Sequence, residues 1–272
     1  MEKILLAMDG YKQNMYAIDF ACYLAKLTKS RLTGVFMEGG LEDFLPASTE
    51  EAVGEVAIGR SAIGEAAATQ HVNRFREACI SREVTAKVHK NRGVPLADIL
   101  LESRFADLIV LDPEASFRKI DKEFPGHFIR DVLLAAECPV IVSPYHFDHL
   151  DEVIFAYNGT SSSVFAIKQF TYLFPEFYQK KAIVVNVSEG GGSSMEETFK
   201  MKEWLSAHYE ELEFVFLKGD VSDELLGYLL QRKDALVVLG AYGRGILSRF
   251  LKPSHASLLL RTINLPIFMA HR

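Results

Sequence analysis

Apolar residues fall along this chain in short continuous runs, and they do not alternate with polar residues. The runs lie within residues 4–10, 106–111, 138–142, 153–159, 234–239 and 265–269. Strands that are buried on both faces have this pattern, because helices cover both sides of a parallel sheet. The pattern therefore predicts several buried parallel strands.

Helical segments are expected between these strands. Apolar side chains recur about every 3.6 residues within residues 11–28, 94–104 and 222–232. Ser222 is the expected N-cap of the third helix, because its hydroxyl can accept a backbone N–H of the first turn. Strands and helices that alternate in this way form right-handed βαβ crossovers and a doubly wound sheet.

The same sequence unit occurs twice along the chain. Four segments of the first half match four of the second in the same order: 4–10 with 153–159, 93–100 with 219–226, 106–111 with 234–239, and 138–142 with 265–269. This order predicts two tandem α/β domains, residues 1–145 and 151–272, each with a doubly wound parallel sheet. The short linker, about 144–151, should hold them against each other as an internal pseudo-dimer.

The first copy is longer than the second, and the excess lies around residues 39–80. We expect a loop at about 39–50 that leads into a long helix at about 58–80. Trp204, the single tryptophan, is spaced with Met201 and Leu205 along a helix, which predicts a core position.

Composition and charge narrow the class of protein. Hydrophobic residues make up 49% of the chain and charged residues 24%, as in a globular protein. The net charge of −6 argues against a nucleic-acid partner. No apolar run is long enough to span a membrane, so we expect a soluble, cytoplasmic protein. Cys22, Cys79 and Cys138 each lie in an apolar stretch, which favours buried packing over reactivity.

A ligand site is expected where the strands of the second copy end, because open parallel sheets bind ligands at their carboxyl edge. Asn158 and Gly159 follow the opening strand, and Gly240 and Gly243 follow the fourth. A helix beginning near Ser254 would direct its positive end toward the same place. Arg244, Arg249 and Lys252 add positive charge nearby.

These residues resemble the nucleotide motif of the universal stress protein family, Gly-x2-Gly-x9-Gly-Ser/Thr after the fourth strand. Gly240, Gly243 and Ser254 fit its spacing. The resemblance covers both copies and implies flavodoxin-like or Rossmann-like domains whose fifth strands pair with each other. It also implies bound ATP or AMP with or without Mg²⁺, a role in stress response or signalling, and a homodimer or other protein partners. The implied nucleotide contacts are Asn158, Gly159, Val187, Gly240, Gly243 and Ser254.

The chain departs from the family pattern at several positions. The aspartate that usually ends the first strand is kept as Asp9 but is Asn158 in the second copy, and Pro253 replaces the third glycine. In the first copy, Asp112 and Glu114 stand where glycine amides would hold phosphate, so a triphosphate is not expected there. A scaffold of the same fold that acts through protein contacts is therefore the alternative to nucleotide binding.

Other polar clusters have simpler interpretations. We predict no catalytic residues and no metal ligands, so a slow ATPase is the weakest of the three functions considered. His146 and His149 lie in the linker, where a surface metal is the less favoured interpretation. Residues 161–163 are expected to be an N-cap cluster, residues 190–194 a flexible connector, and Asn158-Gly159 could form a turn.

Overall fold

The computed structural model describes residues 1–9, 13–37, 68–91, 93–115, 127–188, 195–240 and 263–270. The elements of the first half are β1 (Lys3–Asp9), α1 (Met15–Leu27), β2 (Arg31–Met37), β3 (Ala86–Asn91), α3 (Pro95–Ser103), β4 (Leu108–Leu111), α4 (His127–Ala135) and β5 (Val140–Val142). Residues 68–81 form a further helix before β3. Those of the second half are β6 (Glu152–Tyr157), α5 (Ser161–Leu173), the 3-10 helix η2 (Pro175–Gln179), β7 (Lys181–Ser188), α6 (Met195–Leu205), β8 (Leu212–Lys218), α7 (Val221–Leu229), β9 (Ala235–Gly240) and β10 (Ile267–Ala270).

The two halves repeat one strand order. The ten-stranded sheet runs β3-β2-β1-β4-β5-β10-β9-β6-β7-β8, so each half has its first strand in the middle. Ile4 pairs with Leu108 in the first half, and Val153 pairs with Leu236 in the second. This common register places Asp9 and Asn158 at equivalent positions and confirms the predicted repeat.

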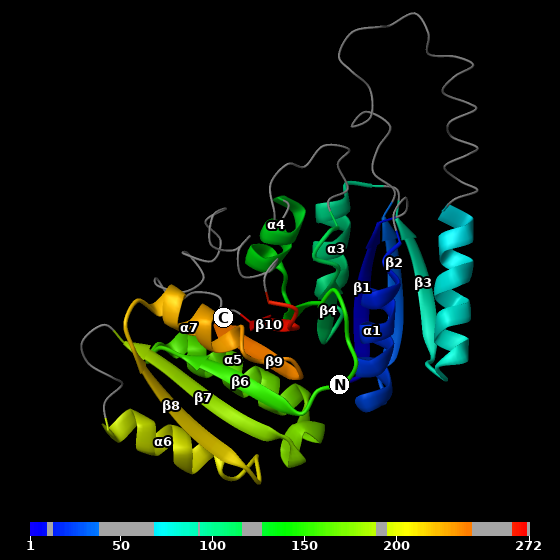
Figure 1. Ribbon diagram of the computed structural model, residues 1–272. Coiled ribbons are helices and arrows are strands. Elements are labelled where there is room, and N and C mark those ends of the chain that lie inside the picture. The colour runs from blue at the N-terminus through cyan, green and yellow to red at the C-terminus, as the bar shows by residue number, and fades with distance from the viewer. Residues whose placement is uncertain are drawn as a thin grey trace, which may run out of the picture.

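The halves join into one sheet through their last strands. β5 and β10 pair antiparallel, with Phe268 opposite Ile141, while the pairs within each half are parallel. Figure 1 shows the two halves side by side around this joint. The predicted fold class, two doubly wound α/β units forming an internal pseudo-dimer, is confirmed.

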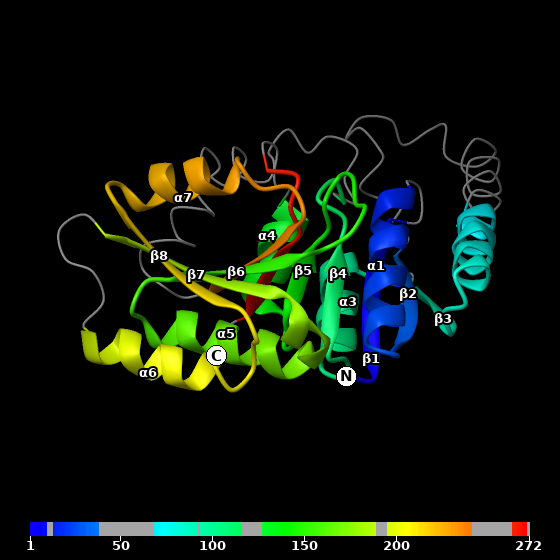
Figure 2. The same ribbon diagram turned by 60° about the horizontal axis from the view of Figure 1, so that its bottom comes forward.

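Helices cover both faces of the sheet, and each face has its own core. One cluster of buried side chains lies under α1, residues 68–81, α5 and α6, and the other under α3, α4 and α7. In Figure 2, α5 and α6 lie on one side of β6–β9 and α7 lies on the other. Alternate residues of the strands therefore belong to alternate cores, which explains why the apolar runs are continuous.

The linker packs on the first half and is tied to the second. The ring of Phe147 lies 5.1 Å from that of Phe20 and 4.6 Å from that of Tyr23, both on α1. Asn264, just before β10, accepts a hydrogen bond from the His146 backbone N–H and donates one to its carbonyl, each 2.9 Å long. The linker thus bridges the two copies.

Several boundaries differ from the sequence-based expectation. The N-cap of α7 is Asp220 and not Ser222, because the Asp220 carboxylate accepts two backbone N–H groups of the first turn. Likewise, Thr160 caps α5, and residues 161–163 form its first turn. Trp204 is only partly buried, at the edge of the core between α5 and α6.

Part of the predicted first-half insertion is described. Residues 68–81 are helical, in agreement with the end of the expected helix, whereas residues 39–50 and 58–67 lie outside the described residues. Among the described residues, no helix is both long and apolar enough to cross a membrane.

Candidate functional site

Three predicted site residues lie together at the carboxyl edge of the second half. β9, β6 and β7 are neighbours in the sheet, and Tyr157 at the end of β6 is level with Asn186 of β7. Asn158, Val187 and Gly240 therefore stand at adjacent strand ends. The strand order reverses at this point, since the chain leaves β6 toward β7 on one side and returns through β9 on the other.

Asn158 and Gly159 form a tight turn into α5. The Asn158 Oδ1 accepts hydrogen bonds from the Thr160 backbone N–H at 3.2 Å and from its hydroxyl at 2.7 Å. Gly159 has φ of +76°, a conformation that side-chain-bearing residues rarely adopt. Asn158 and Gly159 thus form the turn that the sequence suggested as one possibility, and its hydrogen bonds engage the Asn158 side-chain oxygen. A nucleoside contact from Asn158 remains a prediction.

Gly240 allows two pieces of backbone to approach closely. A Cβ atom at this position would lie 2.7 Å from the carbonyl of Ser162 and from the nitrogen of Ser163, both in the first turn of α5. A glycine is needed here to pack the end of β9 against α5, whether or not a phosphate binds.

Val187 and Asn186 face opposite sides of the sheet. Val187 is 9% exposed and belongs to the core under α7. Asn186 alternates with it and so faces α5 and α6, where its Nδ2 donates to the Tyr157 carbonyl at 2.9 Å. Its Oδ1 is buried and has no hydrogen-bond partner among the described residues. Asn186 was not predicted as a site residue, although it is a single polar residue inside the apolar run of β7.

A cavity of about 740 Å³ opens beside this turn, between α5 and α6. Its lining is mainly apolar and aromatic, with charged side chains among it. The described lining residues are Tyr157, Gly159, Thr160, Ser161, Val164, Phe165, Lys168, Glu197, Lys200, Met201 and Trp204. Gly159 is thus a predicted site residue that lines the cavity. Pockets of this size and character hold small organic ligands.

Charged groups flank the aromatic part of the cavity. The Lys168 ammonium lies 5.9 Å from the ring centroids of both Trp204 and Tyr172. The carboxylate of Glu197 lies close to the Gly159 turn. Burial, and to a lesser extent Glu197, raises the pKa of Tyr157, so its phenol stays protonated at neutral pH. The cavity therefore offers a cation and a phenol O–H beside an apolar surface.

The matching position of the first half is acidic. Asp112 follows β4 where Gly240 ends β9, and its Oδ1 accepts hydrogen bonds from the Asn14 Nδ2 at 3.1 Å and the Glu114 N–H at 3.0 Å. Since Asn14 caps α1, a carboxylate lies beside the start of this helix. This carboxylate disfavours an anionic ligand at the helix start, and the absence of triphosphate binding in the first copy stays a prediction.

The rest of the predicted phosphate loop lies outside the described residues. It comprises Gly243, Arg244, Arg249, Lys252, Pro253 and Ser254. Residues 190–194 and Gly10 also lie outside.

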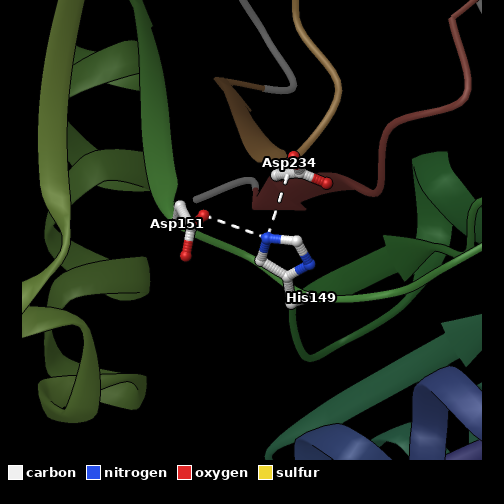
Figure 3. Close-up of side chains that lie close together, drawn as sticks. All are labelled: His149, Asp151 and Asp234. Carbon is white, nitrogen blue, oxygen red and sulfur yellow. Dashed lines mark ion pairs between the residues drawn. The ribbon is translucent and has the colours of Figure 1, made fainter.

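A separate polar cluster lies at the opposite edge of the sheet. The Nε2 of His149 lies 3.0 Å from the Asp151 carboxylate and 3.8 Å from that of Asp234 (Figure 3). Asp151 and Asp234 immediately precede β6 and β9, and a backbone hydrogen bond of 2.8 Å joins them. His146 pairs instead with Asp148 at 3.9 Å, so the two linker histidines belong to different clusters. His149 thus lies between the carboxylates of Asp151 and Asp234.

Solved structures of other proteins share this fold. No protein-family model matches this chain, and no curated protein matches it in sequence. A universal stress protein structure from Archaeoglobus fulgidus is 17% identical, with a TM-score of 0.72, over 99% of this chain and 98% of that one. A Pseudomonas aeruginosa structure described as a universal stress protein is 12% identical, with a TM-score of 0.59, over 100% and 93%. The chain has the universal stress protein fold, built twice in one polypeptide.

Proposed function

We propose that this chain is a universal stress protein that binds an adenine nucleotide, ATP or AMP, in its second half. The observation that carries the proposal is the cavity of about 740 Å³ that opens at the Gly159 turn, where β9, β6 and β7 end. Its aromatic and apolar wall suits a purine base. The phosphates would extend toward the loop after β9, where Gly243 and Ser254 follow in the sequence.

The buried amide of Asn186 lies on the sheet face that α5 and α6 cover, and it is not among the described residues that line the cavity.

We further propose that the protein holds the nucleotide without turning it over. Hydrolysis needs a group that activates water and, in most cases, a metal ligand. Asn158 takes the position where the first half has Asp9, and hydrogen bonds of the turn already engage its side-chain oxygen. The function is then sensing or signalling through the bound state, with or without Mg²⁺.

Calorimetric titration of ATP and of AMP, with and without Mg²⁺, tests this proposal. Trp204 lines the cavity and is the only tryptophan, so its fluorescence reports occupancy in the same samples. We expect saturable binding of one nucleotide per chain and a change in Trp204 emission. Gly243→Asp places a carboxylate in the glycine loop and should weaken binding at least about tenfold, since loss of a charge-assisted contact costs about 1.5–3 kcal/mol.

Gly227→Asp is the matched control. Gly227 lies on α7, and a Cβ there would meet no described atom within 4 Å. The Gly227→Asp substitution adds the same charge without touching the predicted site. The variant should bind nucleotide as the wild type does. Absence of binding at millimolar nucleotide would refute the proposal and favour the scaffold function. Magnesium-dependent phosphate release would refute the non-catalytic part alone.

A further inference from the structure

Two cysteines of the first half are in direct contact inside the core. Cys22 lies on α1 and Cys79 on helical residues 68–81, and their sulfur atoms are 3.8 Å apart. Each residue is 1% exposed. The contact joins segments that are 57 positions apart in the sequence.

An ion pair crosses the same helix interface. Asp19 precedes Cys22 by one helical turn, Arg82 follows Cys79 by a similar distance, and the Arg82 guanidinium pairs with the Asp19 carboxylate. Arg82 also donates to the Ala78 carbonyl at 3.0 Å. Both members of the pair are about one third exposed, at 35% and 37%, so this interface reaches the surface beside the buried sulfurs.

The two thiols differ in proton affinity. The hydrogen bond between the two sulfurs lowers the pKa of Cys79; burial opposes this shift and the Arg82 charge favours it. The same hydrogen bond, together with burial, raises the pKa of Cys22. Cys79 is therefore the nucleophilic sulfur of the pair, and Cys22 is positioned to resolve its oxidised form.

The third cysteine is isolated from this pair. Cys138 belongs to the core on the opposite face of the sheet, whereas Cys22 and Cys79 share the core under α1. Burial raises the pKa of the Cys138 thiol to about 12. Cys138 provides an internal reference for a buried thiol that has no partner thiol in its own core.

We propose that Cys22 and Cys79 form a site of reversible oxidation, which a peroxide converts into an intramolecular disulfide between α1 and the helix of residues 68–81. The Cys79 thiolate attacks one peroxide oxygen, the S–O bond forms, the O–O bond breaks, and hydroxide leaves as water after taking a proton. The Cys22 sulfur then attacks the Cys79 sulfenic acid. The S–S bond forms, the S–O bond breaks, and the second water carries away the Cys22 proton. The sulfurs lose two electrons, and one hydrogen peroxide gains them.

Peptide mapping of the native protein tests the proposal directly. The full-length chain is reduced, freed of reductant, treated with about one equivalent of hydrogen peroxide, alkylated and digested without reduction. We expect a cross-linked peptide containing Cys22 and Cys79, and a fall from three titratable thiols in denaturant to one, Cys138. Dithiothreitol should restore all three.

Matched variants separate this pair from general thiol oxidation. Cys138→Ala should still lose two thiols, whereas Cys79→Ser should form no intramolecular cross-link and keep Cys22 reduced; circular dichroism checks that both variants fold. The proposal fails if the treated wild type keeps three thiols. It also fails if Cys138 enters the cross-link, or if Cys79 passes to sulfinic acid without forming the disulfide. The wild-type map decides the matter even if a variant does not fold.

Discussion

Gly240→Ala tests whether the glycine at the end of β9 serves packing. The added Cβ would lie 2.7 Å from the Ser162 carbonyl group and the Ser163 nitrogen, about 0.7 Å inside the distance of an ordinary contact. These are backbone atoms within the first turn of α5, so neither can move without disturbing the helix. Overpacking of this kind costs about 1–3 kcal/mol. The loss of unfolded-state entropy returns about 0.4–1 kcal/mol.

The expected net loss for Gly240→Ala is therefore about 1–2 kcal/mol. Gly227→Ala is the matched control, because a Cβ on this exposed part of α7 meets no described atom within 4 Å. Alanine in a helix interior should stabilise the protein by about 0.5–1 kcal/mol, so the two substitutions should have opposite signs.

Urea unfolding without nucleotide, followed by far-ultraviolet circular dichroism, measures both effects. With a slope of about 2 kcal/mol per molar urea, the Gly240→Ala midpoint should fall by about 0.5–1 M. The Gly227→Ala midpoint should rise slightly. A Gly240→Ala protein as stable as the wild type would show that the close approach to α5 does not exist. The glycine would then have to be explained by a ligand.

Three further substitutions follow from the same region and its core. Thr160→Ala removes the N-cap of α5 and should cost about 0.5–2 kcal/mol in urea unfolding, whereas Thr160→Ser should recover most of it. Gly159→Ala forces a side chain into φ of +76° and should cost about 1–2 kcal/mol by the same assay. Burial raises the pKa of Tyr209 above its ordinary 10.0, opposed by a hydrogen bond to Thr171. The raised pKa of Tyr209 therefore adds its full contribution to the free energy of unfolding below pH 10. That contribution decreases as the pH rises above 10. Tyr209→Phe should be less stable at neutral pH yet lose less stability between about pH 9 and 11, and an unchanged alkaline slope would contradict the assignment.

The architecture could be predicted because it depends on a pattern that occurs twice. Continuous apolar runs predicted buried strands, and the matched order of segments predicted the tandem. The register of Ile4 with Leu108 and of Val153 with Leu236 confirms that alignment. The pairing of the two last strands came from the family resemblance, because nothing in the local pattern of residues 138–142 or 265–269 specifies a partner.

The site was harder to predict, because its geometry depends on contacts between distant segments. Gly240 reads as part of a phosphate loop, yet its packing role requires α5 to lie beneath it, which spacing alone cannot show. The cavity is formed by the faces of α5 and α6 that meet, so Lys168 and Trp204 could not be assigned to one site. Caps were misplaced by one or two residues because Asp220 and Thr160 compete with neighbouring polar residues for the same backbone N–H groups.

The β5–β10 joint allows the two copies to diverge in a way that a pair of identical chains cannot. In a symmetric dimer every substitution is present twice, so a change that removes one site removes both. Here the sheet continues through a joint within one chain. Asp112 can therefore occupy the position in the first copy that Gly240 occupies in the second, without altering that joint. The pairing also cannot be lost on dilution, since its partners are covalently linked. One half is thus free to serve as a permanent structural support while the other changes its ligand.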